Sequence, residues 1–598
     1  MKKIDITNIV LNENAYFFTA KSKITKKFIL KIFQEARDDK DARRSYDSLI
    51  RQSLFEGGQE VAKYSLDIFD FDQKPSFLKQ PQDLWETKTA LFLILEYKEY
   101  VVIFRKNISG IKSLKSMLEP IDYSILANFY IDDKSKFEKI ISNSLNTADN
   151  AIQTKTAEAI DLKGIMTRFG ASKQVISTMR LDNDGDKATI SLNTSRVNAL
   201  KLRQDLESVL FWSIKMCNLI TGAIVNNKMH RFLAGFALPI DFEKEIQVLN
   251  PKFLLFRFNS LLDQIENGLI QSLYQVNDEG KQLEVKINEI IAPLRGLITL
   301  NKDKENLYNG NGVNVRINQK SITINSDLFK NLFVKMQDDP IAFSYYLNTQ
   351  CHYLITFEQP EYAYTHHKIF KDHKLLNDLE VFLDTFIPEP LLKNVKSEKG
   401  TGYTTNSSEF KGDSIFGIVD NMLKSKDNVI CDDLGVEWGD FIAVHNNQIS
   451  FYHCKHNDNA LSASNLEEVF GQAQKNLGYL ELNDESVEYR RNRWSRAYRL
   501  NNVNTKIKRI RKCKNPSKPI SSIKESIRKA SASGNLKRSV FVVINFLSKS
   551  ELGISLNRLK NGESFENKGV TLQILWFVNA VLSSANEVGV EFRVICRP

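Results

Sequence analysis

Residues 428–456, N-V-I-C-D-D-L-G-V-E-W-G-D-F-I-A-V-H-N-N-Q-I-S-F-Y-H-C-K-H, constrain the fold of this chain more than any other stretch. The apolar run 429–431 predicts a buried strand, and an acidic turn follows it. Two further strand-like runs, 439–444 and 449–455, flank Asn446-Asn447, a pair that tolerates the positive φ angles of tight hairpin turns. The stretch therefore predicts one strand followed by a hairpin.

The predicted hairpin brings three polar side chains together. If it closes at the Asn-Asn pair, Asp440 lies opposite His453, and Lys455 is one diagonal step away on the same face. Such groups are costly among apolar strand positions unless they pair or bind a metal. A carboxylate that holds Mg2+ beside a lysine that stabilises a developing anion suits metal-dependent phosphodiester hydrolysis. An ordinary cross-strand Asp–Lys pair is the alternative interpretation.

The segments D-F-I-A-V and F-Y-H-C-K resemble the active-site hairpin of the PD-(D/E)XK nuclease superfamily, which includes restriction endonucleases and bacterial antiphage effectors. The resemblance covers residues 407–581 and assigns Asp440 and Lys455 to the Asp and Lys of the pattern. His453 stands where the pattern has its second acid. Glu437, three residues before Asp440, or Glu409, on the preceding predicted helix, could supply that carboxylate as a metal ligand.

The order of predicted elements around the hairpin also agrees with this superfamily. Apolar spacing predicts helices over 410–424, with Ser407 or Ser408 as the cap, and over 464–480. Strand-like runs follow at 539–547 and 571–578. The resemblance implies a C-terminal αβββαβ restriction-endonuclease-like core. It also suggests that Gln472, on the helix after the hairpin, positions water or phosphate, although a solvated polar face explains that residue equally well.

Residues 489–538 carry the charge of the chain. They contain seventeen Lys or Arg and one acid, an excess of 16, whereas the whole chain carries +10 and the remainder therefore sums to −6. Such a segment suits phosphate neutralisation, and its aromatic residues could stack on bases or pack against the domain. A solvated face or a flexible insertion is the alternative. The predicted nucleic-acid-binding residues are Arg490, Arg491, Arg493, Trp494, Arg496, Arg499, Lys506, Lys508, Arg509, Arg511 and Lys512.

The first two thirds of the chain carry structural signals without a chemical motif. Hairpins are predicted at 90–105, 179–192 and 313–325, a helical pattern at 39–55, and a long helix at 198–221. The Asn-Gly-Asn-Gly at 309–312 lacks the Gly-Lys-Ser/Thr ending of a phosphate loop and indicates a turn. The Cys and His residues between 351 and 373 fit no zinc spacing.

Length and composition are typical of a multidomain globular protein, and the mixed strand and helix patterns predict the α/β class. At 598 residues with 42% hydrophobic and 26% charged residues, three or four domains are expected. The predicted organisation is an α/β module (1–150), a mixed α+β sensor or regulatory region (151–389), a linker (390–408) and the nuclease-like domain (409–598) with the basic insertion 489–538. No apolar run approaches the ~18 residues of a membrane span. Six scattered cysteines and the lack of a secretion signal favour reduced thiols in the cytoplasm.

These observations, with the resemblance, predict an Mg2+-dependent (or Mn2+-dependent) endonuclease with no membrane involved. The resemblance implies DNA as the substrate, because most of the superfamily cuts DNA, and RNA remains an alternative. The roles expected are Asp440 as metal ligand, Lys455 for the pentavalent phosphate or the attacking water, and His453 as neutral ligand or hydrogen-bond partner of Asp440. The resemblance suggests a regulated antiphage effector that has a defence-system partner protein or forms an oligomer. A nucleic-acid-binding scaffold without activity and a protein-interaction subunit of a defence or repair complex remain alternatives.

Overall fold

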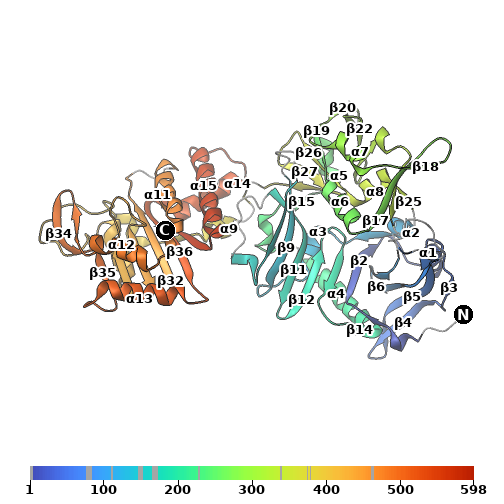
Figure 1. Cartoon of the computed structure of the whole chain (residues 1–598), viewed down its shortest axis with the longest axis horizontal. Coiled ribbons are helices and arrows are strands. Elements are labelled where there is room, and N and C mark those ends of the chain that lie inside the picture. The colour runs from blue at the N-terminus through green and yellow to red at the C-terminus, as the bar shows by residue number, and fades with distance from the viewer. Residues whose placement is uncertain are drawn as a thin grey trace. The chain divides into compact units, whose positions relative to one another are not determined.

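Two mixed α/β units make up the chain (Figure 1). The computed structural model describes residues 5–73, 75, 84–108, 112–145, 152–164, 173–226, 229–336, 340–373, 375–376, 379–458 and 463–598. Described residues up to Asp372 form unit 1, and those from His373 onward form unit 2. All six cysteines are free, and five of them are buried.

Unit 1 is organised around a twelve-stranded antiparallel sheet in the order β10-β9-β11-β12-β13-β2-β7-β6-β5-β3, with β4 on β5 and β8 on β2. The strands are β2 (Asn14–Ala20), β3 (Arg44–Ser45), β4 (Leu49–Glu56), β5 (Gln59–Gln73), β6 (Glu86–Tyr97), β7 (Tyr100–Lys106), β8 (Leu118–Pro120), β9 (Lys136–Ser144), β10 (Thr154–Glu158), β11 (Gln174–Asn183), β12 (Asp186–Ser191) and β13 (Arg196–Ala199). Because β9 pairs with both β10 and β11, the boundary expected at residue 150 falls inside this sheet.

The rest of unit 1 contains smaller antiparallel sheets with their own core. One sheet has the order β15-β28-β27-β26-β16-β19, two have four strands, β18-β17-β24-β25 and β20-β21-β22-β23, and β1 pairs with β14. The strands are β1 (Val10–Leu11), β14 (Gln204–Asp205), β15 (Leu238–Pro239), β16 (Pro251–Phe256), β17 (Ile270–Val276), β18 (Gln282–Glu284), β19 (Ile298–Thr299), β20 (Asn301–Lys304), β21 (Leu307–Gly310), β22 (Val313–Ile317), β23 (Ile322–Ser326), β24 (Leu332–Met336), β25 (Pro340–Ala342), β26 (Tyr353–Phe357), β27 (Tyr362–Thr365) and β28 (Lys368–Lys371).

The three predicted hairpins of unit 1 are confirmed as β6–β7, β11–β12 and β22–β23. The helical pattern at 39–55 is wrong, because most of that stretch pairs as β3 and β4 along β5, where sheet pairing overrides local propensity. The helices of unit 1 are α1 (Lys26–Asp38), α2 (Lys112–Met117), α3 (Tyr123–Asn128), α4 (Leu206–Asn226), α5 (Phe242–Glu245), α6 (Phe258–Glu266), α7 (Ile287–Ile291) and α8 (Phe343–Gln350).

Helix α4 corresponds to the long helix predicted at 198–221, shifted toward the C-terminus. Among the described helices, α4 alone has the length and hydropathy that a membrane span needs. Its buried residues include Trp212, whose ring contacts Phe17 and Phe104 of the twelve-stranded sheet. These contacts are typical of a helix that packs in a protein core.

Unit 2 is a seven-stranded mixed sheet in the order β29-β37-β36-β32-β31-β30-β35. The strands β29, β37, β36 and β32 run parallel, whereas β31 is antiparallel to both of its neighbours. The strands are β29 (Phe386–Pro388), β30 (Asn428–Cys431), β31 (Phe441–His445), β32 (Gln448–Lys455), β35 (Ile510–Lys512), β36 (Lys537–Ser548) and β37 (Val590–Arg597), and β33 (Ala497–Leu500) pairs with β34 (Val503–Lys508) in a separate two-stranded ribbon.

Apolar side chains alternate between the two faces of this sheet, as strand geometry requires. Ile442, Ile449 and Phe451 share one core with most of the helices of the unit. Phe441, Tyr452 and other inner residues of the opposite face share a second core with α10 and the β33–β34 ribbon. The helices of unit 2 are α9 (Leu379–Leu383), α10 (Ile415–Met422), α11 (Ala463–Lys475), α12 (Asp484–Trp494), α13 (Pro519–Ser531), α14 (Lys549–Lys560) and α15 (Lys568–Glu587).

Several sequence predictions for unit 2 need correction. The predicted strand 571–578 lies within helix α15, because a continuous apolar run fits a buried helix as well as a buried strand. The final strand is β37 instead. Helix α10 begins after Ser414, whose side chain accepts a hydrogen bond from the Gly417 amide, so neither Ser407 nor Ser408 caps it.

The segment 390–408, expected to be a linker, is an ordered part of unit 2. Pro390–Asn394 forms a 3-10 helix directly after β29, which pairs with β37. The amide of Ile415 donates to the Ser397 carbonyl, and the amide of Phe416 donates to the Glu398 carbonyl. Residues 397 and 398 are thereby fixed to the start of α10.

The acidic turn after β30 is held by a buried carboxylate. Asp432 is fully buried, and it accepts hydrogen bonds from the Trp438 amide at 2.9 Å and the Trp494 indole at 2.7 Å. The Arg490 guanidinium lies 3.4 Å from the same carboxylate and stacks on the Trp438 ring. Burial raises the pKa of Asp432 to about 6 in spite of these partners. The turn that precedes Asp440 is therefore fixed by interior contacts with α12.

Replacing Trp494 by Phe should lower the free energy of unfolding by about 1–3 kcal/mol, because a buried acceptor on Asp432 loses its indole donor. Chemical denaturation followed by circular dichroism measures this loss. Tyr489→Phe is the matched control, since Tyr489 lies on the same helix and is 70% exposed. Equal stability of the two variants would contradict this role of Asp432.

Candidate active site

The candidate site lies at one edge of the seven-stranded sheet. Strands β30 and β32 end at this edge, and β31 begins there, because β31 is antiparallel to both. Phe441 pairs with Tyr452, which is the register that the sequence predicted. The hairpin thus brings the acidic turn, Asp440 and Lys455 to the same end of the sheet. Open α/β sheets commonly bind ligands beyond their strand ends.

Asp440 lies just before β31 with its carboxyl group buried. Its Oδ2 accepts the backbone amide of Cys454 at 2.7 Å, and its carbonyl accepts the amide of Asp432 at 2.9 Å. Burial raises the pKa of Asp440 well above its ordinary range, and the carboxylates of Asp433 and Glu398 raise it further. The Cys454 amide and the Lys399 ammonium oppose this shift. Asp440 is therefore a buried carboxyl group with two other carboxyl groups, those of Asp433 and Glu398, close enough to raise its pKa.

Glu398 and Lys399 reach this site from the ordered segment before α10. Glu398 accepts the backbone amide of His456, and burial raises the pKa of its carboxyl group although Lys399 and Lys455 lower it. The Lys399 ammonium lies 3.0 Å from Asp433 Oδ1. Burial opposes protonation of Lys399, but the nearby carboxylates outweigh burial and raise the pKa of Lys399. The group thus contains three carboxylates and one ammonium within unit 2.

Lys455, at the end of β32, donates to Glu468 of α11 at 2.7 Å. Both Asp440 and Lys455 are described, and no ion pair joins them. Glu398 interacts electrostatically with both, so it connects the acid before β31 with the lysine on β32. Asp440 and Lys455 thus lie at the same end of the sheet, but their partners differ: Asp440 accepts the Cys454 amide, whereas Lys455 donates to Glu468 on α11. The predicted meeting of the two side chains on one face of the hairpin stays a prediction.

His453 is 1% exposed and lies on the face of β32 that carries Ile449 and Phe451. Burial lowers the pKa of His453 to about 4, and the Lys475 ammonium contributes to this. Its Nε2 has no hydrogen-bond partner among the described residues. The imidazole is thus neutral at pH 7 and does not donate to Asp440. Gln472 lies on α11 one turn after Glu468, the partner of Lys455, and therefore shares a helix side with it.

The two acids that the sequence offered as additional metal ligands have other neighbours. The Glu437 carboxylate lies near Asp432 and raises its pKa by charge repulsion. The Glu437 Oε2 atom has no hydrogen-bond partner among the described residues. Glu409 precedes α10, is largely exposed and pairs with Arg511. Asp433 and Glu398 are the acids that the structure brings to Asp440 instead.

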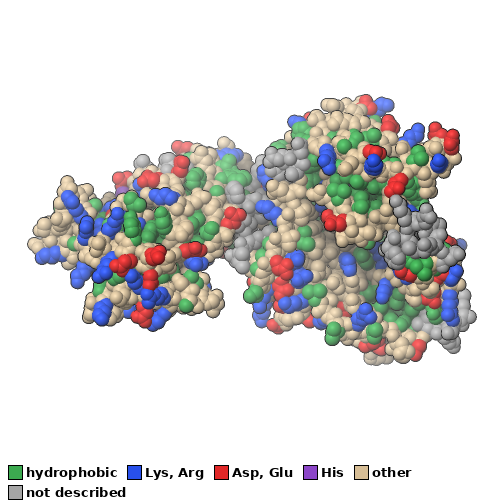
Figure 2. Space-filling model, viewed as in Figure 1, with side chains coloured by type: hydrophobic (Ala, Val, Ile, Leu, Met, Phe, Trp, Pro, Cys, Tyr) green, Lys and Arg blue, Asp and Glu red, His purple; other side chains and the backbone are tan. Residues whose placement is uncertain are grey.

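The predicted nucleic-acid-binding residues divide into an interior and a surface group. Arg490, Trp494 and Arg509 are buried, and Arg511 pairs with Asp420 at 2.8 Å. We assign these four to packing, because their side chains are already engaged inside unit 2. Figure 2 shows basic side chains gathered over the end of this unit where Figure 1 places β34. The exposed members of the predicted set are Arg491, Arg496, Arg499, Lys506, Lys508 and Lys512, and Arg493 is half-buried.

Three site residues, Glu398, Lys399 and Asp433, were not predicted from the sequence. Glu398 and Lys399 lie in a polar stretch with Gly400 and Gly402, a composition typical of linkers. One signal was available for Asp433, since it follows a predicted buried strand within the acidic turn. No local pattern reveals that the segment around Glu398 packs against α10.

The donor set fits a hard divalent cation by chemical type. Asp440, Asp433 and Glu398 offer carboxylate oxygens, which Mg2+ prefers. A bound dication would offset the repulsion and burial that raise the pKa of Asp440 and Glu398. In the part of the chain that the structure describes, no three His, Cys, Asp or Glu side chains are close enough to hold an ion without moving. Coordination of one ion by all three carboxylates would therefore need them to approach one another, whereas one or two carboxylates with water and substrate oxygens are the usual ligands of Mg2+.

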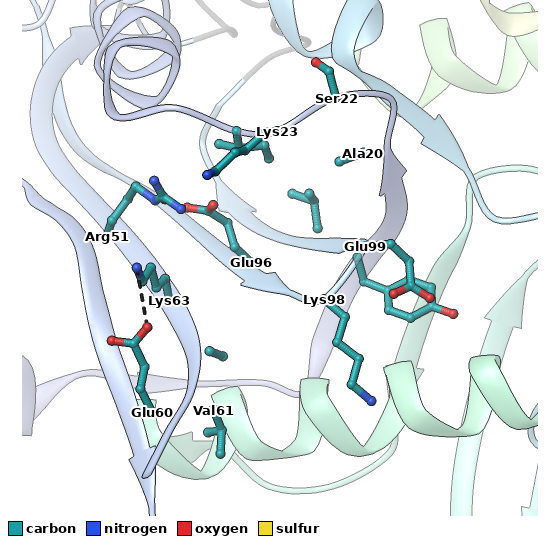
Figure 3. A pocket seen from close by; sticks show the side chains of 14 residues that line it. Ala20, Ser22, Lys23, Arg51, Glu60, Val61, Lys63, Glu96, Lys98 and Glu99 are labelled. Carbon is teal, nitrogen blue, oxygen red and sulfur yellow. Dashed lines mark hydrogen bonds and ion pairs between the residues drawn. The ribbon is translucent and has the colours of Figure 1, made fainter.

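Unit 1 contains cavities of a different character. One polar pocket of about 530 Å³ is lined by both acids and bases, and Figure 3 shows Arg51 and Glu96 side by side and Lys63 with Glu60. These charges largely neutralise one another, with Arg51 Nε 3.1 Å from Glu96. A second cavity of about 680 Å³ has mainly apolar walls. Neither cavity carries a recognisable catalytic arrangement.

The histidines of unit 1 take part in hydrogen bonds to protein groups. The His366 Nε2 lies 3.2 Å from the Arg257 guanidinium and 3.4 Å from the Asn143 amide. His352 contacts the Tyr346 hydroxyl at 3.2 Å.

No protein-family model matches the chain, and no protein of curated function is similar to it in sequence.

The buried imidazole of His453 should make stability depend on pH. Its pKa of about 4 lies below the ordinary 6.5, so the unfolded chain binds more protons between these values. Stability is then complete above pH 6.5 and decreases toward pH 4, by about 3 kcal/mol in total for this group.

Denaturant titrations across pH 4–7 measure this dependence, and His453→Gln should reduce its slope. His445→Gln is the matched control, because His445 lies on the same hairpin and is half-buried beside Asp427. An unchanged slope in the His453→Gln protein would contradict the burial of a neutral imidazole.

Proposed function

We propose that unit 2 is a metal-dependent nuclease that hydrolyses phosphodiester bonds in DNA. The observation that carries the proposal is the buried Asp440 carboxyl group at the sheet edge, with Glu398 and Asp433 beside it and Lys455 at the end of the next strand. Clusters of titratable groups with raised pKa values at a strand-end site are typical of catalytic centres.

The order of elements supports the same proposal. Helix α10, the antiparallel strands β30, β31 and β32, helix α11 and the parallel strand β36 follow one another along the chain. This order supports the αβββαβ core that the resemblance to the PD-(D/E)XK superfamily implies. Extra elements, α12 to α13 with the β33–β34 ribbon, are inserted between α11 and β36.

In the proposed mechanism, Asp440 with Glu398 and Asp433 would hold Mg2+ or Mn2+, and Glu398 replaces the acid that the superfamily pattern expects at His453. The ion, when bound, supplies Lewis acidity and an activated water. Lys455 leaves Glu468 to stabilise the charge that develops on the phosphate, and Lys399 contributes further positive charge. Gln472, next to Glu468 on the same helix side, orients water or phosphate.

The remainder of the proposal concerns the biological setting. A free nuclease endangers its own cell, and unit 1, with more than half of the described residues, is large enough to regulate unit 2. A cytoplasmic antiphage effector is the setting that the superfamily resemblance supports.

One observation favours a second candidate function. Lys455 is bonded to Glu468 and His453 replaces the expected acid, as in a site that has lost catalysis. The protein would then be a nucleic-acid-binding scaffold that does not cut. Binding without cleavage under every metal condition would establish this alternative.

Cleavage of supercoiled plasmid in Mg2+ or Mn2+ tests the proposed function. Asp440→Asn and Glu398→Gln should each reduce the rate by on the order of a hundredfold or more, because each removes a carboxylate from an ion whose Lewis acidity contributes several kcal/mol. Glu467→Gln is the control, since Glu467 is exposed on α11 beside the Lys455 partner Glu468. Equal rates in Asp440→Asn and the control would contradict the assignment of the site.

A further inference from the structure

The β33–β34 ribbon is a separate two-stranded element, with no strand of the seven-stranded sheet paired to it. Ala497 pairs with Lys508 at its base and Leu500 with Val503 at its tip. Asn501 and Asn502 form the turn, with φ values of 47° and 65°. Two-residue hairpin turns of this kind require positive φ at both central residues. This part of the basic segment is therefore a paired β-ribbon, whereas the sequence had left a flexible insertion open as an alternative.

The inner face of the ribbon is fixed to unit 2. Tyr498 is fully buried, and its hydroxyl donates to Asp433 Oδ2 at 2.9 Å. Ile507 is also fully buried, and the Lys506 amide donates to the Ser407 carbonyl at 2.8 Å. Asp433 belongs to the acid group around Asp440, so the hydrogen bond from Tyr498 joins the ribbon to the candidate active site. A ligand bound on the ribbon would therefore lie near that site.

The outer face of the ribbon carries the residues that point away from this core. Arg499 and Asn504 pair across the strands, and Lys506 and Lys508 follow on the same exposed face. None of the three basic side chains forms an ion pair within the described part of the chain, whereas Arg490, Arg509 and Arg511 are engaged inside unit 2. The ribbon thus presents unneutralised positive charge.

The side chains at the outer end of the ribbon are of the kind that reads bases. Arg pairs with guanine and Asn with adenine through two hydrogen bonds each. Arg499 donates to Asn502 Oδ1 at 2.9 Å, so these two side chains are held together at the tip, beside Asn501 and Asn504. Lysines, which act as point charges on phosphates, lie farther from the tip.

We infer that the outer face of the β33–β34 ribbon docks in the major groove of double-stranded DNA and gives the proposed nuclease its sequence preference. The inference rests on the proposed function and names the substrate as B-form duplex. A two-stranded ribbon fits the B-form major groove, about 12 Å wide, with one face on the bases and the other on the protein. The major groove of A-form RNA is too narrow to admit it.

Two sets of variants separate the roles of the ribbon. Arg499→Ala/Lys506→Ala/Lys508→Ala removes its charge, and Lys302→Ala/Lys304→Ala/Lys335→Ala removes the same charge from exposed strands of unit 1. Asn501→Gly/Asn502→Gly removes the polar side chains of the tip and keeps the turn, because Gly adopts the same positive φ. All are made in the full chain with Asp440→Asn, so that binding is measured without cutting.

The experiment is fluorescence anisotropy in Ca2+ with a duplex of 20 base pairs, its single strand and the corresponding RNA duplex, followed by selection from random duplex DNA. The parent should prefer duplex DNA at least about tenfold. The ribbon triple variant should weaken binding and lower the slope of log affinity against log salt by about 1 for each phosphate that the ribbon no longer neutralises. The Asn501→Gly/Asn502→Gly protein should bind duplex but select no motif or a different one.

Equal duplex affinity of the two triple variants, or binding that favours single strands or duplex RNA, would overturn the ribbon inference. An Asn501→Gly/Asn502→Gly protein that selects the parental motif would overturn the reading role of the two turn asparagines. These outcomes do not depend on catalysis: plasmid cleavage by the chain with Asp440 intact tests the nuclease separately. Ribbon-dependent duplex binding without any cleavage would reject the nuclease and retain the ribbon as a DNA-binding element.

Discussion

The organisation of unit 2 depends on the burial of acids in the turn between β30 and β31. An ionised carboxylate inside a protein costs several kcal/mol unless other groups compensate it. Asp432 is compensated by an indole, an amide and a guanidinium, and this holds the turn against α12. Burial raises the pKa of Asp440, the neighbouring carboxylates raise it further, and the one backbone amide that Asp440 accepts does not offset them. The same short turn therefore contains one acid that stabilises the fold and one that lies in the candidate site.

The basic segment after α11 shows how one compositional signal can serve two purposes. Arg490, Arg509 and Arg511 neutralise or bridge groups of the acidic turn and of α10. Arg499, Lys506 and Lys508 alternate with buried residues on a ribbon and face outward. A strand places successive side chains on opposite faces, so adjacent cations and apolar residues separate into a surface and a core.

Prediction from the sequence succeeded where local pattern and tertiary environment agree. The alternation of 439–455 specified both the hairpin and its register, because a slip of one residue would move Ile442, Ile449 and Phe451 away from their core. Prediction failed at 571–578, where an apolar run fits a helix and a strand equally well, and at 39–55, where pairing with β5 decided the outcome. The segment 390–408 was misjudged because its hydrogen bonds to α10 involve backbone groups, which leave no trace in composition.

The sequence by itself determined the hairpin, the position of Asp440 and Lys455 at one sheet edge, the helix α11 and the strand β36, since each depends on periodicity within a short window. Only the tertiary structure decided which acids accompany Asp440. Glu398 arrives from a segment 42 residues earlier in the sequence, and Asp433 from the end of a neighbouring strand. It also decided which cations are buried and which are exposed. The grouping of the acids depends on long-range packing and leaves no periodic signal in the chain. On the ribbon the alternation of cations with apolar residues is visible in the sequence, whereas the burial of Arg490, Arg509 and Arg511 depends on the tertiary partners that a buried charge requires.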